Sequence, residues 1–373
     1  AFAYRTDWPD PVPGAEDVVL RVRACTLNYH DVFTRNGMPG IKVPMPIIIG
    51  IDIAGDIVAV GSSVQGFKVG DRVLVDPIDR VKGGLTGETY DGGLAEYVRI
   101  PAHQLVPLDP AISYADAAAL PVAYGTAYRM MIARGKVSAG ETVLILGASG
   151  GVGTCCVQLA KQAGATVAVC ASSDEKLARL AEIGADHLIN YATDDFVKAS
   201  QALFGRARVF QDEGKGVDVV VNFTGGDTWT RSLRVMKRDG RLLTCGATAG
   251  YNPPEDIRFI WTFELNIIGS NGWSRQDVID LLGLVKVTDL PVSRDELFKV
   301  EDDDKAAIHE ISPPQQTRKP PVGFLMTGNA HEYDRASRVP AAPFPPPCAA
   351  LPSTRPAAGR DRRRRNPGRQ APP

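Results

Sequence analysis

The sequence predicts an α/β protein made of two unlike parts, and three observations support this fold class. Residues 1–113 are rich in Gly, Pro and β-branched residues, which is typical of short strands joined by turns. From Ala115 onwards, strand-like and helix-like stretches alternate, which indicates parallel βαβ units. A glycine-rich turn follows the first strand of this alternating part. The chain has 373 residues, which is long enough for two domains.

The elements follow from these patterns in chain order. In the first part, strands are predicted at 17–25 (DVVLRVRAC), 53–61 (IAGDIVAVG), 71–76 (DRVLVD) and 94–100 (LAEYVRI). The second part starts with a helical pattern at 115–133. A parallel sheet with its helices is then predicted from 143–147 (VLILG), 152–164 (VGTCCVQLAKQAG), 166–171 (TVAVCA), 174–184 (DEKLARLAEIG), 218–224 (DVVVNFT), 228–236 (TWTRSLRVM), 240–246 (GRLLTCG) and 266–270 (NIIGS).

Charge and cysteine content exclude several classes of protein. The formal net charge of -1 gives no reason to expect a nucleic acid or a membrane surface as partner. No apolar run approaches the roughly 20 residues that span a bilayer. The six cysteines are scattered without a CxxC pair, and no secretory signal is visible at the start of the chain. We therefore expect a reducing, cytoplasmic location.

The last residues, 311–373, differ in composition from the rest. They hold 14 of the 28 prolines and 11 Lys plus Arg against three acids. Such proline-rich, apolar-poor sequence cannot bury enough surface to offset the entropy of ordering, so we expect disorder. The abrupt change is also what a shifted reading frame produces. A nucleic-acid patch at Arg362 to Arg365 is the less favoured interpretation.

The glycine-rich turn has the parts that dinucleotide binding requires. A buried strand leads into a turn with Gly147, Gly150 and Gly153 three residues apart, and a helix follows. Glycine lets backbone N–H groups approach a pyrophosphate, which lies at the positive end of the helix dipole. A role in packing alone is the alternative. The candidate cofactor-binding residues here are Gly147, Ala148, Ser149, Gly150, Gly151, Val152 and Gly153.

The end of the next strand indicates which nicotinamide cofactor is used. An NAD site usually has Asp or Glu there to bind the ribose hydroxyls, whereas this chain has Ala171. The hydroxyls and the cation that suit a 2′-phosphate come from Ser172, Ser173, Lys176 and Tyr191. NADP(H) is therefore the predicted cofactor. The alternative is that the serines only cap a helix and that the lysine is solvated.

Several ordered motifs together make roughly residues 5–310 resemble the medium-chain dehydrogenase/reductase superfamily. They include VVLRVRACTLNYHDVFTRNG, IIGIDIAGDIVAVG, VGDRVLV, GGLAEYVRIP, LPVAYGTAY, GASGGVG, EIGADHLINY, GVDVVVNFTGG and GRLLTCG. The resemblance implies a GroES-like β-rich catalytic domain at 1–113, a Rossmann domain with a doubly wound parallel sheet at 114–271, and a return segment at 272–310. It also implies that a strand before residue 1 is missing. A homodimer through the edge of the Rossmann sheet, around NIIGS, is a further expectation.

The resemblance implies that a catalytic zinc site is absent. Zinc-dependent members bind the ion through a cysteine, a histidine followed by glutamate, and a third cysteine or related ligand. The matching places hold Asn28, Ile51 followed by Asp52, and Val122. Zinc requires thiolate, imidazole or carboxylate ligands, so we predict no metal. The stretch 76–93, where a structural zinc would bind, contains no cysteine.

The Leu27 to Asp31 stretch, LNYHD, resembles the zinc-free quinone oxidoreductase and enoyl reductase branch. This implies NADPH-dependent hydride transfer to a quinone or α,β-unsaturated carbonyl compound. Asn28, Tyr29 and Asp52 are the candidate catalytic residues, although Tyr29 could simply pack between domains. The family places further cofactor contacts at Thr126, Thr224, Gly225, Gly246 and Ala247. The alternatives are an alcohol dehydrogenase and a catalytically idle NADPH-binding protein.

Overall fold

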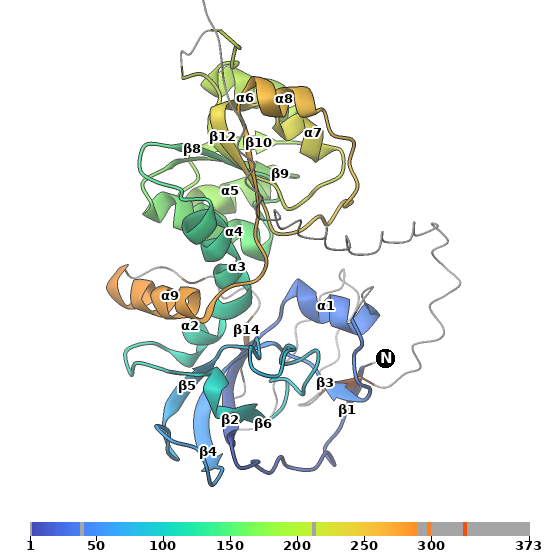
Figure 1. The fold of residues 1–373 in the computed structure, drawn as a ribbon, viewed down its shortest axis with the longest axis vertical. Coiled ribbons are helices and arrows are strands. Elements are labelled where there is room, and N and C mark those ends of the chain that lie inside the picture. Colours follow the sequence, from blue (N-terminus) through green and yellow to red (C-terminus); the bar gives the residue numbers. More distant parts are fainter. Residues whose placement is uncertain are drawn as a thin grey trace, which may run out of the picture. The chain divides into compact units, whose positions relative to one another are not determined.

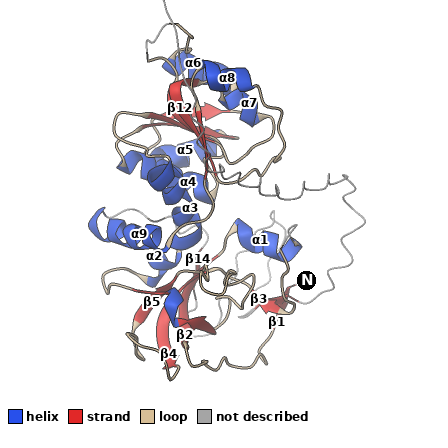
Figure 2. Ribbon diagram, in the orientation of Figure 1, coloured by secondary structure: helices blue, strands red, loops and turns tan. Residues whose placement is uncertain are grey.

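The computed structural model describes residues 2–37, 41–210, 214–288, 292, 297–299 and 324–326. These residues form an antiparallel sheet, a parallel sheet flanked by helices, and a small sheet of three strands (Figure 1). Figure 2 shows the strand-rich part with β2, β4 and β5 and the helix-rich part with α4 to α8. The predicted fold class is confirmed.

The antiparallel sheet is built around the strand β2. Its members are β2 (Asp17–Thr26), β4 (Asp52–Val60), β5 (Arg72–Val75), β6 (Tyr97–Pro101), β7 (Leu105–Pro107) and β14 (Leu297–Lys299). β2 pairs with β4, β6 and β14, while β5 joins β4 to β7. Valine, leucine and isoleucine side chains from these strands form a separate core cluster, including Leu20, Ile57 and Val73.

Shorter elements surround this sheet. They are the helix α1 (Tyr29–Asn36), a 3₁₀ turn (Ala102–Gln104), and the strands β1 (Phe2–Tyr4), β3 (Ile47–Ile48) and β15 (Phe324–Met326). β15 pairs antiparallel with β1 and with β3. It belongs to the segment that we expected to be disordered. The rest of 311–373 lies outside the described residues, so that expectation stays a prediction.

The parallel sheet has the strand order β10-β9-β8-β11-β12-β13. This is the order 3-2-1-4-5-6 of a dinucleotide-binding fold when its strands are numbered along the chain. The strands are β8 (Thr142–Ile145), β9 (Thr166–Ala171), β10 (His187–Asn190), β11 (Val217–Val221), β12 (Met236–Thr244) and β13 (Asn266–Gly269). The helices are α4 (Gly151–Gln162), α5 (Asp174–Glu182), α6 (Phe196–Phe204), α7 (Thr228–Ser232) and α8 (Ile257–Thr262).

Both faces of the parallel sheet are buried. On β8, Val143 and Ile145 belong to one hydrophobic cluster, whereas Leu144 between them belongs to another. Successive side chains of a strand point to opposite faces, so apolar residues at every position require cover on both sides. This explains why the strands read as continuous apolar runs.

The helical pattern predicted at 115–133 is interrupted in the structure. It forms α2 (Tyr114–Ala118), a π-helical turn (Leu120–Tyr124), α3 (Gly125–Tyr128) and a second π-helical turn (Arg129–Arg134). Pro121 lies in the first π-helical turn. Proline has no backbone N–H to donate, so it interrupts the regular hydrogen-bond pattern at this point.

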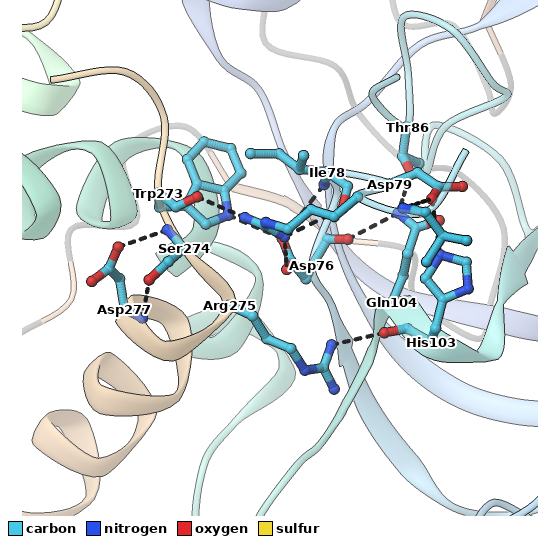
Figure 3. A network of polar contacts seen from close by, with 12 residues as sticks. Asp76, Ile78, Asp79, Thr86, His103, Gln104, Trp273, Ser274, Arg275 and Asp277 are labelled. Carbon is cyan, nitrogen blue, oxygen red and sulfur yellow. Dashed lines mark hydrogen bonds and ion pairs between the residues drawn. The ribbon is translucent and has the colours of Figure 1, made fainter. Parts of the chain in front are cut away.

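A polar network joins the loop after β5 to the segment before α9 (Arg275–Thr288) (Figure 3). The buried Asp76 carboxylate accepts a hydrogen bond from Trp273 Nε1 at 3.1 Å and pairs with Arg80. Arg80 also donates to the Trp273 carbonyl at 2.6 Å, and Arg275 donates to the His103 carbonyl at 3.0 Å. These contacts hold the return segment against the β-rich part. Across the described ranges, no helix is long and apolar enough to cross a bilayer.

Candidate cofactor and active site

The strand order places the glycine-rich turn at the point where the parallel sheet changes direction. β8 lies between β9 and β11, so the next strands along the chain extend the sheet on opposite sides. Ligands of such sheets bind at the carboxyl ends of the strands that flank this point. The turn at 146–150 follows β8, and the turn at 222–226 follows β11.

Two glycines at the turn are required, Gly147 by its positive φ and Gly153 by a close approach of backbone atoms. Gly147 has φ +68°, and a Cβ added there would lie 3.2 Å from the Phe223 ring and 3.3 Å from Thr224 Oγ1. A Cβ on Gly153 would lie 2.4 Å from the Gly147 carbonyl oxygen. Gly153 therefore lets the first turn of α4 pack directly on the loop, as a dinucleotide site needs.

The amino end of α4 fits an anionic group. Gly150 is the N-cap, and no side chain caps the helix. Ser149, Gly150 and Gly151 are exposed, and a Cβ on Gly150 would have only the Gly147 carbonyl oxygen within 4 Å, at 3.6 Å. The first N–H groups of a helix lack intrahelical acceptors, so a pyrophosphate can accept from them. Ala148 is buried and Val152 is half-buried, and the side chains of these two residues pack inside the protein.

The loops after β11 and β12 meet next to Gly147. The Ala249 N–H donates to the Thr224 carbonyl at 2.7 Å, and the Gly226 N–H donates to the Gly250 carbonyl at 2.8 Å. A Cβ on Gly225 would lie 3.0 Å from the Ala247 Cβ. The structure thus brings together Gly147, Thr224, Gly225, Gly246 and Ala247, which sequence analysis had assigned to the cofactor. Thr126 lies half-buried on α3, a helix that packs against α4.

The polar residues after β9 form a small exposed cluster. Ser173 caps α5 by accepting from the Lys176 N–H at 3.4 Å, as the alternative interpretation expected. The Lys176 ammonium also donates to Ser172 Oγ at 3.2 Å. Asp174 is engaged by Asn190, whose amide donates to it at 2.8 Å. The cap and a phosphate-binding pair are therefore compatible, because the cap uses Ser173 and the pair uses Ser172 and Lys176. Tyr191, after β10, is exposed.

Asp52 is the centre of a buried hydrogen-bond cluster. Asn28 Nδ2 donates to Asp52 Oδ2 at 2.9 Å, and the Val122 N–H donates to Asp52 Oδ1 at 3.1 Å. Thr26 Oγ1 lies 3.1 Å from Asp52 Oδ2. The Asp52 side chain is almost completely buried, and Asn28 is 6% exposed. The Asp52 carboxyl group is thus held by Thr26 on β2, by Asn28 before α1 and by Val122 in the first π-helical turn, and it in turn orients the Asn28 amide.

The Asp52 carboxyl group is easily protonated. Burial raises its pKa from 3.8 to about 8, although hydrogen bonds from Asn28 and Thr26 and from the Val122 N–H oppose this rise, and the nearby Asp31 carboxylate adds to it. The geometry fits a protonated carboxyl group. Thr26 Oγ1 lies 3.1 Å from both Asp52 Oδ2 and the Ala118 carbonyl oxygen, yet a hydroxyl carries one proton. Thr26 can donate to Asp52 when the carboxyl group is ionised, and to the Ala118 carbonyl when a protonated Asp52 donates to Thr26.

Tyr29 and His30 begin α1, immediately after Asn28. Tyr29 is 63% exposed, and its ring packs edge-on against Phe33 of the same helix at 5.0 Å between centroids. Its hydroxyl group is therefore accessible to a small molecule. His30 instead pairs with the buried Glu88 at 2.5 Å. Asp31 helps to orient the helix, because it accepts from the Asn28 N–H at 2.7 Å.

Two groups of residues in the site were not found from the sequence. Thr26 and the Val122 N–H contact Asp52, but they become neighbours only when separate elements fold together. Asn222 was inside a recognised motif but received no role. The signal that could have identified it is its position, as a polar residue directly after the apolar VVV run of β11.

Comparison with known proteins identifies the family. An alcohol dehydrogenase GroES-like domain model matches residues 14–110, and a zinc-binding dehydrogenase model matches residues 151–286. Quinone oxidoreductase from Homo sapiens is 30% identical over 255 residues, which cover 68% of this chain and 72% of that protein. The chain belongs to the medium-chain dehydrogenase/reductase superfamily. Within it, the chain is an oxidoreductase of the quinone oxidoreductase branch, a group that binds nicotinamide cofactors.

Solved structures of the superfamily agree with this assignment. An NAD-dependent alcohol dehydrogenase has a TM-score of 0.68 and 32% identity, covering 76% of this chain and 85% of the other. The 2-octenoyl-CoA carboxylase reductase CinF, in complex with NADP and 2-octenoyl-CoA, has a TM-score of 0.65 and 28% identity, covering 76% and 73%. The matched region covers 72% of the human quinone oxidoreductase and 53% of a synaptic vesicle membrane protein VAT-1 homolog from Rattus norvegicus.

The residues of this chain do not fit the zinc ion that the name of the second family model implies. Asn28 uses its amide on Asp52, Ile51 is fully buried and apolar, and Val122 contributes a backbone N–H rather than a ligand. None of these groups is a thiolate, an imidazole or a carboxylate. Within the described residues, no three His, Cys, Asp or Glu side chains gather into a metal site. We therefore derive no catalytic step through a metal.

Proposed function

We propose that this chain is an NADPH-dependent, zinc-independent reductase of quinones or α,β-unsaturated carbonyl compounds. The observation that carries the proposal is the hydrogen bond from Asn28, which stands at the place of the first zinc ligand in zinc-dependent relatives, to Asp52, which follows the place of the second. Alcohol oxidation without a metal lacks the main stabiliser of the alkoxide. Reduction of an activated double bond needs only hydrogen-bond donors near the carbonyl oxygen.

The residues can divide this chemistry between them. A bound reduced nicotinamide would supply the hydride, and hydride addition at the β-carbon of an enone would leave negative charge on the carbonyl oxygen. Asn28 has a second amide N–H besides the one that binds Asp52, and it can donate to that oxygen. The exposed Tyr29 hydroxyl, or water, supplies the proton that completes the product. Asp52 holds the amide in place and does not contact the substrate.

NADP(H) is the proposed cofactor because of the residues after β9. Ser172 and Lys176 contact each other at the surface, and together they offer a hydroxyl and a cation to a 2′-phosphate. The likeness to CinF, a structure in complex with NADP, supports this choice. The glycine-rich turn and the amino end of α4 would hold the pyrophosphate.

An alcohol dehydrogenase is the second candidate, favoured by the likeness to an NAD-dependent alcohol dehydrogenase. Oxidation of NADPH with quinones, enones and aldehydes, with metal content measured on the same sample, separates the two. We expect turnover on quinones or enones without stoichiometric zinc. Alcohol oxidation that requires bound zinc would contradict the proposal. Cofactor binding without turnover on any substrate would favour an idle binding protein.

A further inference from the structure

Asn222 is a buried polar residue at the carboxyl end of β11, the strand that flanks the change of direction in the sheet. Its side chain is fully buried. β11 pairs with β8 on one side and with β12 on the other. The residue therefore lies at the edge of the sheet where the loops after β8, β11 and β12 meet.

The Asn222 side chain uses its full hydrogen-bonding capacity. Its Oδ1 accepts from the N–H groups of Thr224 and Gly225, each at 3.0 Å. Its Nδ2 donates to Thr228 Oγ1 at 3.1 Å and to Ser232 Oγ at 3.0 Å, both on α7. An amide side chain has two N–H donors and one carbonyl oxygen, so all of its groups are satisfied.

These bonds set the shape of the turn that follows. Gly225 and Gly226 have φ values of +68° and +51°, which only a defined turn maintains. This turn contacts the two neighbouring loops. Thr224 Oγ1 would lie 3.3 Å from a Cβ on Gly147, in the loop after β8, and Gly225 lies against Ala247, in the loop after β12. One buried amide thus connects the loop after β11 to the loops after β8 and β12.

We propose that Asn222 is a positioning residue that shapes the Thr224–Gly225 turn into a support for the nicotinamide end of the cofactor. This inference rests on the proposed cofactor contacts at Thr224 and Gly225. Asn222 acts through the turn and does not touch the cofactor. In the proposed function, α4 would hold the pyrophosphate and the residues after β9 the phosphate-bearing ribose, so Asn222 would affect only the nicotinamide end of the ligand.

Two substitutions separate the turn-shaping bonds from simple filling of space. Asn222→Leu keeps the branched shape and the number of side-chain heavy atoms but cannot accept from Thr224 N–H and Gly225 N–H. Asn222→Asp keeps an oxygen that can accept from both N–H groups, so it retains the two bonds that shape the turn. Ser232→Ala is the matched control, because it removes a buried bond to Asn222 Nδ2 and leaves both turn bonds intact.

The test compares dissociation constants for NADPH and for 2′-phospho-ADP-ribose, which lacks the nicotinamide. We expect Asn222→Leu to weaken NADPH binding about tenfold, because two backbone N–H groups lose their acceptor, and to change fragment binding less than about twofold. Asn222→Asp and Ser232→Ala should stay within about threefold of wild type for both ligands. NADH and ADP-ribose give the same comparison if the chain prefers NAD.

A purely structural role for Asn222 would weaken both ligands equally or lower thermal stability alone, and either result overturns the proposal. Asn222→Ala, the milder truncation, replaces Asn222→Leu if the latter does not fold, and fragment binding reports that the cofactor domain is intact. A wild-type chain that binds NADPH but reduces no quinone or enone would contradict the proposed function and not this inference.

Discussion

At the scale of single residues, the buried carboxyl group of Asp52 couples stability to pH. Burial raises its pKa from 3.8 to about 8. Between these values the folded chain keeps a proton that the unfolded chain has released, so the free energy of unfolding falls as pH rises. Below both values each state carries the proton, and above both values neither does. The dependence is therefore confined to the interval between them.

We expect Asp52→Asn to remove this dependence, because an amide does not titrate. Relative to wild type, the variant should gain up to about 1.4 kcal/mol of stability per pH unit between about pH 5 and about pH 8. Urea denaturation at several pH values measures the difference, in which titrating groups that do not interact with Asp52 cancel. A difference that is constant over this range would contradict a raised pKa.

Lys176 carries the prediction about cofactor choice. Its ammonium lies 3.2 Å from Ser172 Oγ and is exposed, so its removal should not disturb the fold. We expect Lys176→Ala to raise the KM for NADPH about tenfold and to leave the KM for NADH within about twofold, because only NADPH has the 2′-phosphate. Lys198→Ala, another exposed lysine, is the control. Equal losses for both cofactors would exclude this role.

At the scale of elements, the glycines between β8 and the first turn of α4 have different roles, one in folding stability and one in cofactor binding. A Cβ on Gly153 would lie 2.4 Å from the Gly147 carbonyl oxygen, whereas one on Gly150 would lie 3.6 Å from it, with φ at -86°. Gly150→Ala should therefore keep the melting temperature but weaken cofactor binding at least about tenfold, because the methyl group would project from the amino end of α4, where the pyrophosphate is proposed to bind. Gly153→Ala should lower both the melting temperature and the cofactor affinity.

Calorimetry and cofactor titration of the two variants check this. Unchanged cofactor affinity in Gly150→Ala would mean that the pyrophosphate does not approach this turn. A loss of melting temperature in Gly150→Ala equal to that in Gly153→Ala would mean that both glycines serve packing alone, which was the alternative drawn from the sequence.

Elements governed by local pattern could be predicted from the sequence, and those governed by distant contacts could not. The strand, turn and helix around Gly147 are encoded by neighbouring residues, and the structure has them there. The partners of Asp52 and Asp76, by contrast, come from residues far along the chain. Val122 contacts Asp52 across 70 positions, and Trp273 contacts Asp76 across 197. Periodicity carries no information about such pairs.

At the scale of the whole molecule, β13 is the feature that bears on assembly. Within the described residues it ends the parallel sheet and pairs only with β12. Ile267 on this strand is 40% exposed, and Ile257 and Trp261 on α8 are more exposed still. An apolar edge strand is a template for pairing with another chain. We propose that two copies join their sheets through β13 as a homodimer.

Ile267→Lys tests this proposal, because a two-fold axis would place the new charge close to its own copy. We expect light scattering to show a dissociation constant of the dimer at least about tenfold higher than for wild type. Ile279→Lys is the matched control, since Ile279 on α9 is also 40% exposed and should leave assembly unchanged. Equal effects of the two substitutions, or a dimer that survives Ile267→Lys, would place the interface elsewhere. Cofactor affinity should be the same in both variants, because β13 lies at the opposite end of the sheet order from β9 and β10, next to which the ribose phosphate would bind.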